Sequence, residues 1–141
     1  MCIRDRGHPV VHYQHRGVAK SLLRCYYRMA DVMLVTPFKD GMNLVAKEYV
    51  ACHDDGSGAL VLSEFAGAAD ELSQAYLCNP FDIESVKAAL LNALKALDDA
   101  PSTMTQRMLT MHQQVTEHDV CLLYTSPSPR DVEESRMPSS A

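Results

Sequence analysis

The chain has 141 residues, with 13 Lys and Arg against 18 Asp and Glu, and a formal net charge of -5. That length suffices for one domain with a core of its own, or for a large part of one. With 47% hydrophobic and 22% charged residues, the composition is globular and excludes a disordered or collagen-like chain. The mild acidity argues against a general nucleic-acid binder, which usually carries a basic patch.

Neither a membrane span nor a metal or redox centre is indicated. No apolar run approaches the roughly 20 residues that a membrane helix needs, and the N-terminus lacks the apolar region of a signal peptide. The five cysteines lie far apart and form no C-x-x-C pair, which zinc clusters and thioredoxin-type sites require. We therefore expect reduced, mostly buried thiols, a cytoplasmic location, no membrane contact, no metal and no cofactor.

The first elements predicted along the chain are a strand, a helix and a second strand. Residues 9–13 form a short strand candidate, and residues 18–30 carry Leu and Tyr side chains near helical spacing. The unbroken apolar run 32–35 is a second strand, which Thr36 and Pro37 end. Short, continuously apolar strands are typical of a parallel sheet that helices cover on both faces.

The middle of the chain continues this alternation. Helices are expected over 43–52 and 67–72, and strands over 59–62 and 75–78. Strands that alternate with helices in this way predict an α/β fold, a Rossmann-like doubly wound parallel sheet.

The last third of the chain is predicted to form two helices. Asp82 can cap the first, whose buried stripe comprises Val86, Ala89, Leu90, Ala93, Leu94 and Leu97. The second begins at Ser102 and carries on one face Met104, Met108, Met111 and Val115. We interpret these methionines as core packing.

Two loops follow predicted strands at the edge where parallel sheets bind ligands, beyond the carboxyl ends of the strands. They comprise residues 36–43 and 63–69. In the first, Gly41 permits a tight turn and the close approach of a ligand to the backbone. The amides of residues 42–45 lack intrahelical acceptors because they form the first turn of a helix. Such amides attract an anion, most naturally phosphate or diphosphate.

Two carboxylates flank this anion position. Asp40 lies beside it, and a carboxylate there accepts hydrogen bonds from hydroxyl groups. Glu48 lies one turn after Leu44 on the same helix face and can reach a second set of hydroxyls. An anion between two hydroxyl-binding carboxylates describes a nucleotide sugar. The spacing leaves an alternative open, in which Asp40 only caps the turn and Glu48 is a solvated helix residue.

The segment DGMNLVAKEYVA (40–51) resembles the donor-site signature of trehalose-6-phosphate synthases, and so does VLSEFAGAA (61–69). The resemblance extends from about residue 9 to residue 119. It implies the GT-B fold of retaining glycosyltransferases, of which the chain would be the truncated C-terminal half. The implied reaction transfers glucose from UDP-glucose to glucose 6-phosphate with retention of configuration, and UDP-glucose and glucose 6-phosphate are the expected partners.

The same resemblance implies roles for individual residues of the donor site. The donor-sugar site would comprise Asp40, Gly41, Met42 and Asn43. The amides of Leu44 and Val45 would bind the diphosphate, and Glu48 would bind the ribose. The stretch around Gly17, Val18 and Leu23 lies where the family contacts uracil. Asp40 would bind sugar and not act as a nucleophile, because the family's reaction resembles front-face substitution.

Several parts of the family's active site have no counterpart in the chain. The diphosphate-binding Arg and Lys, the catalytic-loop His and the acceptor-binding domain are expected upstream of residue 9. No catalytic residue is therefore assignable, and the chain alone is expected to be inactive. Two alternatives remain: another GT-B glycosyltransferase with a different nucleotide or acceptor, and a nonenzymatic nucleotide-sugar-binding regulatory subunit. A homo-oligomer of the full-length parent is left open.

The two ends differ from the middle. Residues 1–6 show no periodicity, and the tail from residue 121 is rich in Pro and Ser, which offer little core. Both MCIRDR at the start and CLLYTSPSPRD near the end resemble translated sequencing-adaptor sequence. We expect residues 1–6 and 121–141 to be adaptor-like or disordered, and residues 7–120 to form a partial C-terminal nucleotide-sugar-binding domain.

Overall fold

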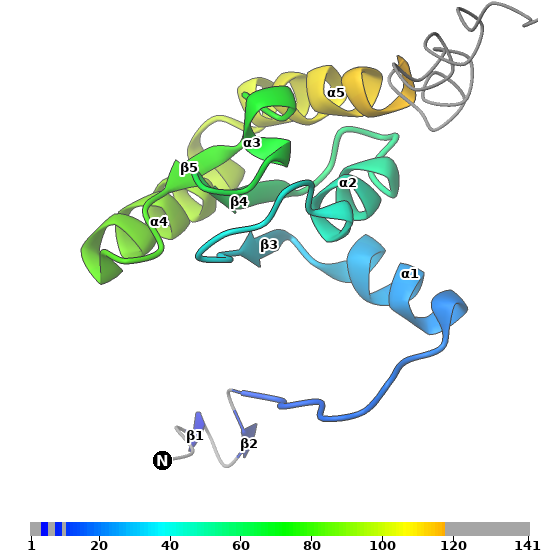
Figure 1. Cartoon of the computed structure of the whole chain (residues 1–141), viewed down its shortest axis with the longest axis vertical. Helices are drawn as coiled ribbons and strands as arrows, with labels where there is room; N and C mark the ends of the chain where they lie inside the picture. The colour runs from blue at the N-terminus through cyan, green and yellow to red at the C-terminus, as the bar shows by residue number, and fades with distance from the viewer. Residues whose placement is uncertain (1–3, 6–7, 10, 118–141) are drawn as a thin grey trace, which may run out of the picture.

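The computed structural model describes residues 4–5, 8–9 and 11–117. A parallel sheet of three strands lies at its centre, in the order β3 (Val32–Val35), β4 (Ala59–Ser63) and β5 (Tyr76–Cys78). All five residues of the central strand β4 are buried. Because the strands are parallel, their carboxyl ends meet at one edge of the sheet (Figure 1). The loops predicted to bind ligand leave the sheet at this edge.

Helices α2 (Leu44–Ala51) and α5 (Pro101–Glu117) cover one face of this sheet, and α4 (Ile83–Asp99) covers the other. The helices α1 (Lys20–Met29) and α3 (Ala68–Glu71) pack against α2. Successive side chains of β4 point to opposite faces. Leu60 and Leu62 pack in a cluster with residues of α2 and α5, whereas Ala59 and Val61 pack with residues of α4. The predicted α/β architecture with a parallel sheet covered on both faces is confirmed.

The two C-terminal helices follow their predicted patterns closely. Asp82 caps α4 by accepting a hydrogen bond of 3.0 Å from the amide of Glu84. On α5 the predicted core methionines are buried: Met104, Met108 and Met111. The prediction that Leu94 belongs to the buried stripe is wrong, because its side chain is 44% exposed. The buried contact of α4 runs through the small residues Ala89 and Ala93, and a narrow stripe of this kind leaves Leu94, about 100° further round the helix, in solvent.

The strand predicted over 9–13 is wrong for residues 11–13. Strand β2 (His8–Pro9) pairs antiparallel with β1 (Arg4–Asp5), outside the parallel sheet. Residues 11–19 form neither strand nor helix, and α1 begins two residues later than predicted. The side chains of Val11 and Tyr13 are 71% and 79% exposed. A strand needs a neighbour for its N–H and C=O groups, and this segment leads away from the sheet to α1 (Figure 1).

The three cysteines that the structure describes are less buried than expected. Cys78 is buried and Cys52 is half-buried, but Cys25 is exposed on α1, and all three are free thiols. Within residues 4–5, 8–9 and 11–117, no three His, Cys, Asp or Glu side chains form a group that could hold a metal ion. Burial raises the pKa of the Cys78 thiol, with a smaller contribution from the charge of Glu64, so that side chain packs as a neutral group.

The expectations for the two ends fall mainly outside the described residues. Of 1–6 only the backbone of β1 is described, and 121–141 lie beyond the last described residue. In the part of the chain that the structure covers, no helix combines the length and the hydrophobicity that a membrane span requires.

Candidate functional site

The two loops predicted to bind ligand lie side by side and share backbone hydrogen bonds. We call residues 36–43 the β3–α2 loop and residues 64–67 the β4–α3 loop. The amide of Asp40 donates to the carbonyl of Phe65 over 3.4 Å, and the amide of Gly67 donates to the carbonyl of Asp40 over 2.8 Å. A parallel bridge between Asp40 and Ala66 extends the sheet by one step. The backbone of Asp40 is therefore held from the neighbouring loop.

Gly67 lets the two loops approach this closely. A Cβ atom at position 67 would overlap the carbonyl oxygen and carbon of Gly41. The β4–α3 loop is itself closed by Ser63, whose buried hydroxyl accepts a hydrogen bond of 3.1 Å from the amide of Phe65. Only a residue without a side chain can lie at position 67, because the neighbouring group is backbone and cannot rotate away.

The Asp40 carboxylate closes the turn of its own loop. Its Oδ1 accepts from the amides of Met42 and Asn43 over 3.1 and 3.0 Å, and its Oδ2 accepts from the Asn43 side-chain amide over 2.9 Å. These contacts are the ones expected if Asp40 caps the turn, which the sequence left open as an alternative to sugar binding. A carboxylate offers about four acceptor positions, and Oδ2, which takes one of these bonds, retains capacity for a hydroxyl group.

Asn43 determines where the amides of the loop point. Its backbone is left-handed, with φ 64° and ψ 76°, and its Oδ1 caps α2 by accepting from the amide of Ala46 over 2.9 Å. Asn tolerates this conformation better than other residues with a side chain. Gly41 does not have a positive φ, so the left-handed turn residue of the loop is Asn43. The space beside Gly41 is open, because a Cβ atom at this position would meet no other atom within 4 Å.

Of the four amides predicted to attract an anion, those of Met42 and Asn43 donate to Asp40, and those of Leu44 and Val45 are left at the start of α2. The side chains of Leu44 and Val45 are 58% and 42% exposed. Among the described residues no acceptor is recorded for their backbone amides, whereas the amide of Ala46 is capped by Asn43. These two amides and the positive end of the helix provide a place for an anion.

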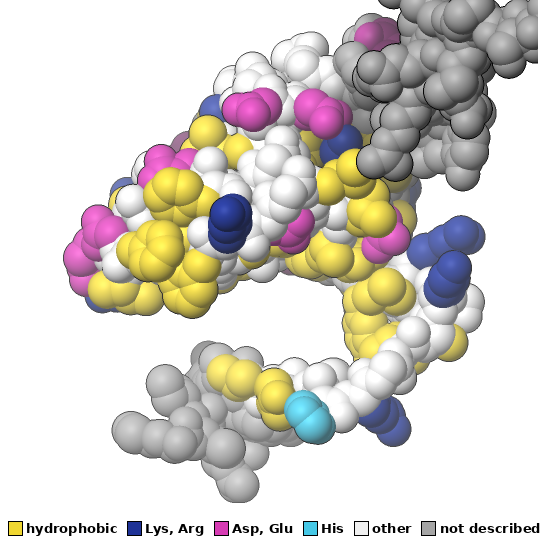
Figure 2. All heavy atoms as spheres, viewed as in Figure 1, with side chains coloured by type: hydrophobic (Ala, Val, Ile, Leu, Met, Phe, Trp, Pro, Cys, Tyr) yellow, Lys and Arg dark blue, Asp and Glu magenta, His cyan; other side chains and the backbone are white. Residues whose placement is uncertain are grey.

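Aromatic side chains surround the loops at the carboxyl edge of the sheet. The rings of Phe38 and Phe81 lie 4.8 Å apart and those of Phe65 and Phe81 lie 5.6 Å apart, centre to centre. All three side chains are exposed, by 42% to 70%. Figure 2 shows hydrophobic side chains gathered at the left end of the body, over the start of α4 and the adjoining loops. The β3–α2 loop thus lies beside an apolar surface.

Glu48 faces a pocket of about 580 Å³ between α1 and α2. The lining residues are Lys20, Leu23, Arg24, Tyr27, Glu48, Ala51 and Cys52. The structure therefore brings together Leu23 and Glu48, which the resemblance relates to uracil and ribose. It also adds Tyr27, whose hydroxyl donates to Glu48 Oε2 over 3.2 Å. Tyr27 was not among the predicted site residues, because a tyrosine on an amphipathic helix is ordinarily a packing residue.

The hydrogen bonds of the β3–α2 loop predict a low pKa for Asp40. The amide of Met42 is the main cause, and the side chain and amide of Asn43 add to it, so the carboxyl titrates below its usual value of 3.8. A depressed folded-state pKa adds stability above the unfolded-state pKa, and this is lost as the pH falls through the folded value. We expect a carboxyl-detected NMR titration to place the midpoint of Asp40 below the ordinary aspartate value of 3.8. A midpoint at or above 3.8 would contradict these contacts.

A family comparison covers most of the chain. The sequence model described as "Glycosyltransferase family 20" matches residues 4–122. Among curated relatives, a trehalose-6-phosphate synthase of Mycobacterium sp. (strain JLS) is 57% identical over 116 residues, which are 82% of this chain and 23% of the relative. That of Mycolicibacterium vanbaalenii is 59% identical over 114 residues, with 81% and 23% covered. The chain thus spans about a quarter of their length.

Solved structures agree with the sequence comparison. An E. coli structure, described as "Trehalose-6-phosphate from E. coli bound with UDP-2-fluoro glucose", superposes with a TM-score of 0.77 at 40% identity, over 85% of this chain and 27% of the other. An α,α-trehalose-phosphate synthase (UDP-forming) from Burkholderia xenovorans, in complex with glucose-6-phosphate, gives a TM-score of 0.77 at 41% identity, with 84% and 26% covered.

Proposed function

The chain belongs to glycosyltransferase family 20, and we propose that it supplies the nucleotide-sugar part of a trehalose-6-phosphate synthase. The parent enzyme would have the GT-B fold and transfer glucose from UDP-glucose to glucose 6-phosphate with retention. The observation that carries the proposal is the start of α2, where two free amides lie between Asp40, in the β3–α2 loop, and Glu48, one turn along the helix. The free thiols favour a reducing compartment such as the cytoplasm.

The proposed donor site assigns one part of the nucleotide sugar to each group of residues. The diphosphate would lie against the amides of Leu44 and Val45, which need an acceptor. The glucose would lie over Gly41, where the backbone is open, with one hydroxyl donating to Asp40. The amides of Met42 and Asn43 would turn to the sugar only by giving up their hydrogen bonds to Asp40.

This arrangement suits departure of a diphosphate. When the bond between the glucose anomeric carbon and the diphosphate breaks, negative charge grows on the leaving oxygen. Amides fixed at a helix start stabilise that charge without reorganising. Asp40 is a poor candidate for a nucleophile, because three hydrogen bonds already stabilise its carboxylate. We therefore propose that Asp40 holds the sugar while the acceptor hydroxyl attacks from the side that the diphosphate leaves.

The donor site is tested by calorimetric titration of the 141-residue chain with UDP-glucose. We expect weak binding, and we expect Asp40→Ala and Glu48→Ala each to raise the Kd by about tenfold, since each removes a charged acceptor of substrate hydroxyls. Asp98→Ala, at an exposed position on α4, is the matched control and should bind as the unaltered chain does. Equal affinities for all four proteins would refute the assigned roles.

Two further measurements test the proposal, and the second also tests the alternative of a different GT-B transferase. Because the acceptor site is proposed to lie outside the chain, the chain should form no trehalose 6-phosphate from UDP-glucose and glucose 6-phosphate. A panel of UDP-, GDP- and ADP-glucose tests the nucleotide. Preference for UDP-glucose supports the synthase, and preference for another nucleotide favours a different GT-B transferase.

A further inference from the structure

Glu48 would need to be held in place to recognise a ribose. Its side chain lies on the outer face of α2, where it is exposed, and a long exposed side chain samples many rotamers. The recorded side-chain contact that restrains it is the hydrogen bond of 3.2 Å from the Tyr27 hydroxyl to Oε2. That contact joins α1 to α2 across the pocket wall.

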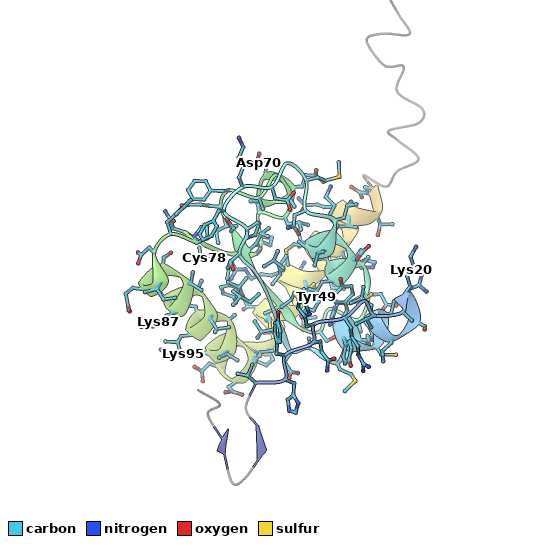
Figure 3. The ribbon with its side chains drawn as sticks, turned by 60° about the horizontal axis from the view of Figure 1, so that its bottom comes forward. Lys20, Tyr49, Asp70, Cys78, Lys87 and Lys95 are labelled. Atoms are coloured by element: carbon cyan, nitrogen blue, oxygen red, sulfur yellow. The ribbon has the colours of Figure 1, made fainter. Side chains whose placement is uncertain are left out.

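The Tyr27 ring is buried and packs against another aromatic side chain. The residue is 7% exposed, and the ring meets that of Tyr49 edge to face, with centres 6.4 Å apart and planes at 89°. Tyr49 lies in the interior (Figure 3), is fully buried, and donates to the carbonyl of Ala30 over 2.9 Å. Its ring also packs on that of buried His53, 4.3 Å away. The hydroxyl of Tyr27 therefore projects from a rigid aromatic stack.

We propose that Tyr27 is a positioning residue for nucleotide recognition, which orients the Glu48 carboxylate toward the ribose hydroxyls of a bound uridine diphosphate. This inference rests on the proposed function. With Oε2 held by Tyr27, no described residue is recorded as a partner of Oε1, and Oε2 keeps a second lone pair. The carboxylate can then accept from both neighbouring hydroxyls of one ribose.

A neutral partner suits this task better than a cation. Lys20 and Arg24 also line the pocket, but no ion pair from either to Glu48 is recorded among the described residues. An ion pair would occupy the carboxylate and offset its charge, whereas the tyrosine hydroxyl leaves the full negative charge for the ribose. Burial, and then the charge of Glu48, raise the pKa of Tyr27, so it remains a donor at neutral pH.

The test is a double-mutant cycle measured as UDP affinity by titration calorimetry of the 141-residue chain. Tyr27→Phe keeps the ring and removes the hydroxyl. We expect it to raise the Kd for UDP by about three- to tenfold, the range for one intramolecular hydrogen bond. In a Glu48→Ala background the same change should have no further effect, because the group that Tyr27 positions is gone.

A second probe and a control complete the experiment. UDP that lacks both ribose hydroxyls should bind Tyr27→Phe and the unaltered chain equally, since the positioned carboxylate has nothing to accept from. Tyr26→Phe, at a neighbouring, 45% exposed tyrosine of α1, is the matched control and should leave UDP affinity unchanged. Tyr26→Phe should unfold at the same temperature as the unaltered chain. Tyr27→Phe should still unfold cooperatively, with a Tm lowered by several degrees at most, because it loses one hydrogen bond worth about 1 kcal/mol and creates no large cavity.

Each contrary result has its own meaning. If Glu48→Ala weakens UDP binding but Tyr27→Phe does not, the positioning role is overturned and the donor site stands. If Tyr27→Phe weakens binding equally with and without Glu48, Tyr27 acts through the fold and the inference is wrong. If the unaltered chain and Glu48→Ala bind UDP alike, the proposed donor site fails, and the inference fails with it.

Discussion

Gly67→Ala is expected to lower the free energy of unfolding by about 3 kcal/mol, the upper range for overpacking, and to abolish measurable binding of UDP-glucose. The added methyl would overlap the Gly41 carbonyl. Because this neighbour is backbone, relief requires the β3–α2 loop to move away. That movement breaks the hydrogen bond from the Gly67 amide to the Asp40 carbonyl. Chemical denaturation and calorimetric titration measure the two effects.

Gly41→Ala is the matched control for the stability measurement. A Cβ atom there meets nothing within 4 Å and the backbone φ is not positive, so we expect a change in unfolding free energy below about 0.5 kcal/mol. The same methyl would point into the space assigned to the glucose, so donor binding should still weaken. If Gly41→Ala and Gly67→Ala have the same free energy of unfolding, the packing of the two loops does not restrict position 67.

Asn43→Ala is expected to lower the free energy of unfolding by about 2 kcal/mol. Loss of the cap to the Ala46 amide accounts for about 1 kcal/mol, and alanine in a left-handed conformation adds about 1 kcal/mol. The variant also loses the hydrogen bond from the Asn43 side chain to Asp40 Oδ2. Loss of that bond frees the turn, so UDP-glucose affinity should fall together with stability. Urea denaturation and titration calorimetry test both.

Asn43→Gly separates the two causes. Glycine adopts φ 64° without strain and costs only a few tenths of a kcal/mol at a cap position. We therefore expect the free energy of unfolding of Asn43→Gly to lie within about 1 kcal/mol of that of the unaltered chain. It should be clearly higher than that of Asn43→Ala. Equal stabilities would show that the backbone conformation of Asn43 does not matter, and that the cap alone accounts for the loss.

Secondary structure was predictable wherever apolar spacing was strong. The run 32–35, the helix that Asp82 begins and the methionine face of α5 were each predicted from period and capping, and the structure confirms them. The strand predicted over 9–13 failed because a strand depends on a partner elsewhere in the chain. The predicted burial of Leu94 was wrong because helical periodicity identifies an apolar face but not the width of the surface that covers it.

The candidate site was predictable in position but not in its hydrogen bonds. The order of strand, loop and helix placed Asp40 and the free amides of α2 at the carboxyl edge of the sheet, where the structure has them. Whether Asp40 faces a sugar or its own loop depends on the backbone turn at Asn43, and the amino-acid order alone left both alternatives open. The roles of these residues toward UDP-glucose stay predictions.

By itself, the amino-acid sequence determined the α/β architecture, the family resemblance and the loop that begins α2, because these depend on local spacing and on a long specific signature. Only the tertiary structure decided that Gly67 must be glycine and that Tyr27 meets Glu48. Both facts arise from segments more than 20 residues apart in sequence, and contacts of that kind depend on how elements pack. Such packing follows from the combined burial of both faces of the sheet, which no single segment encodes.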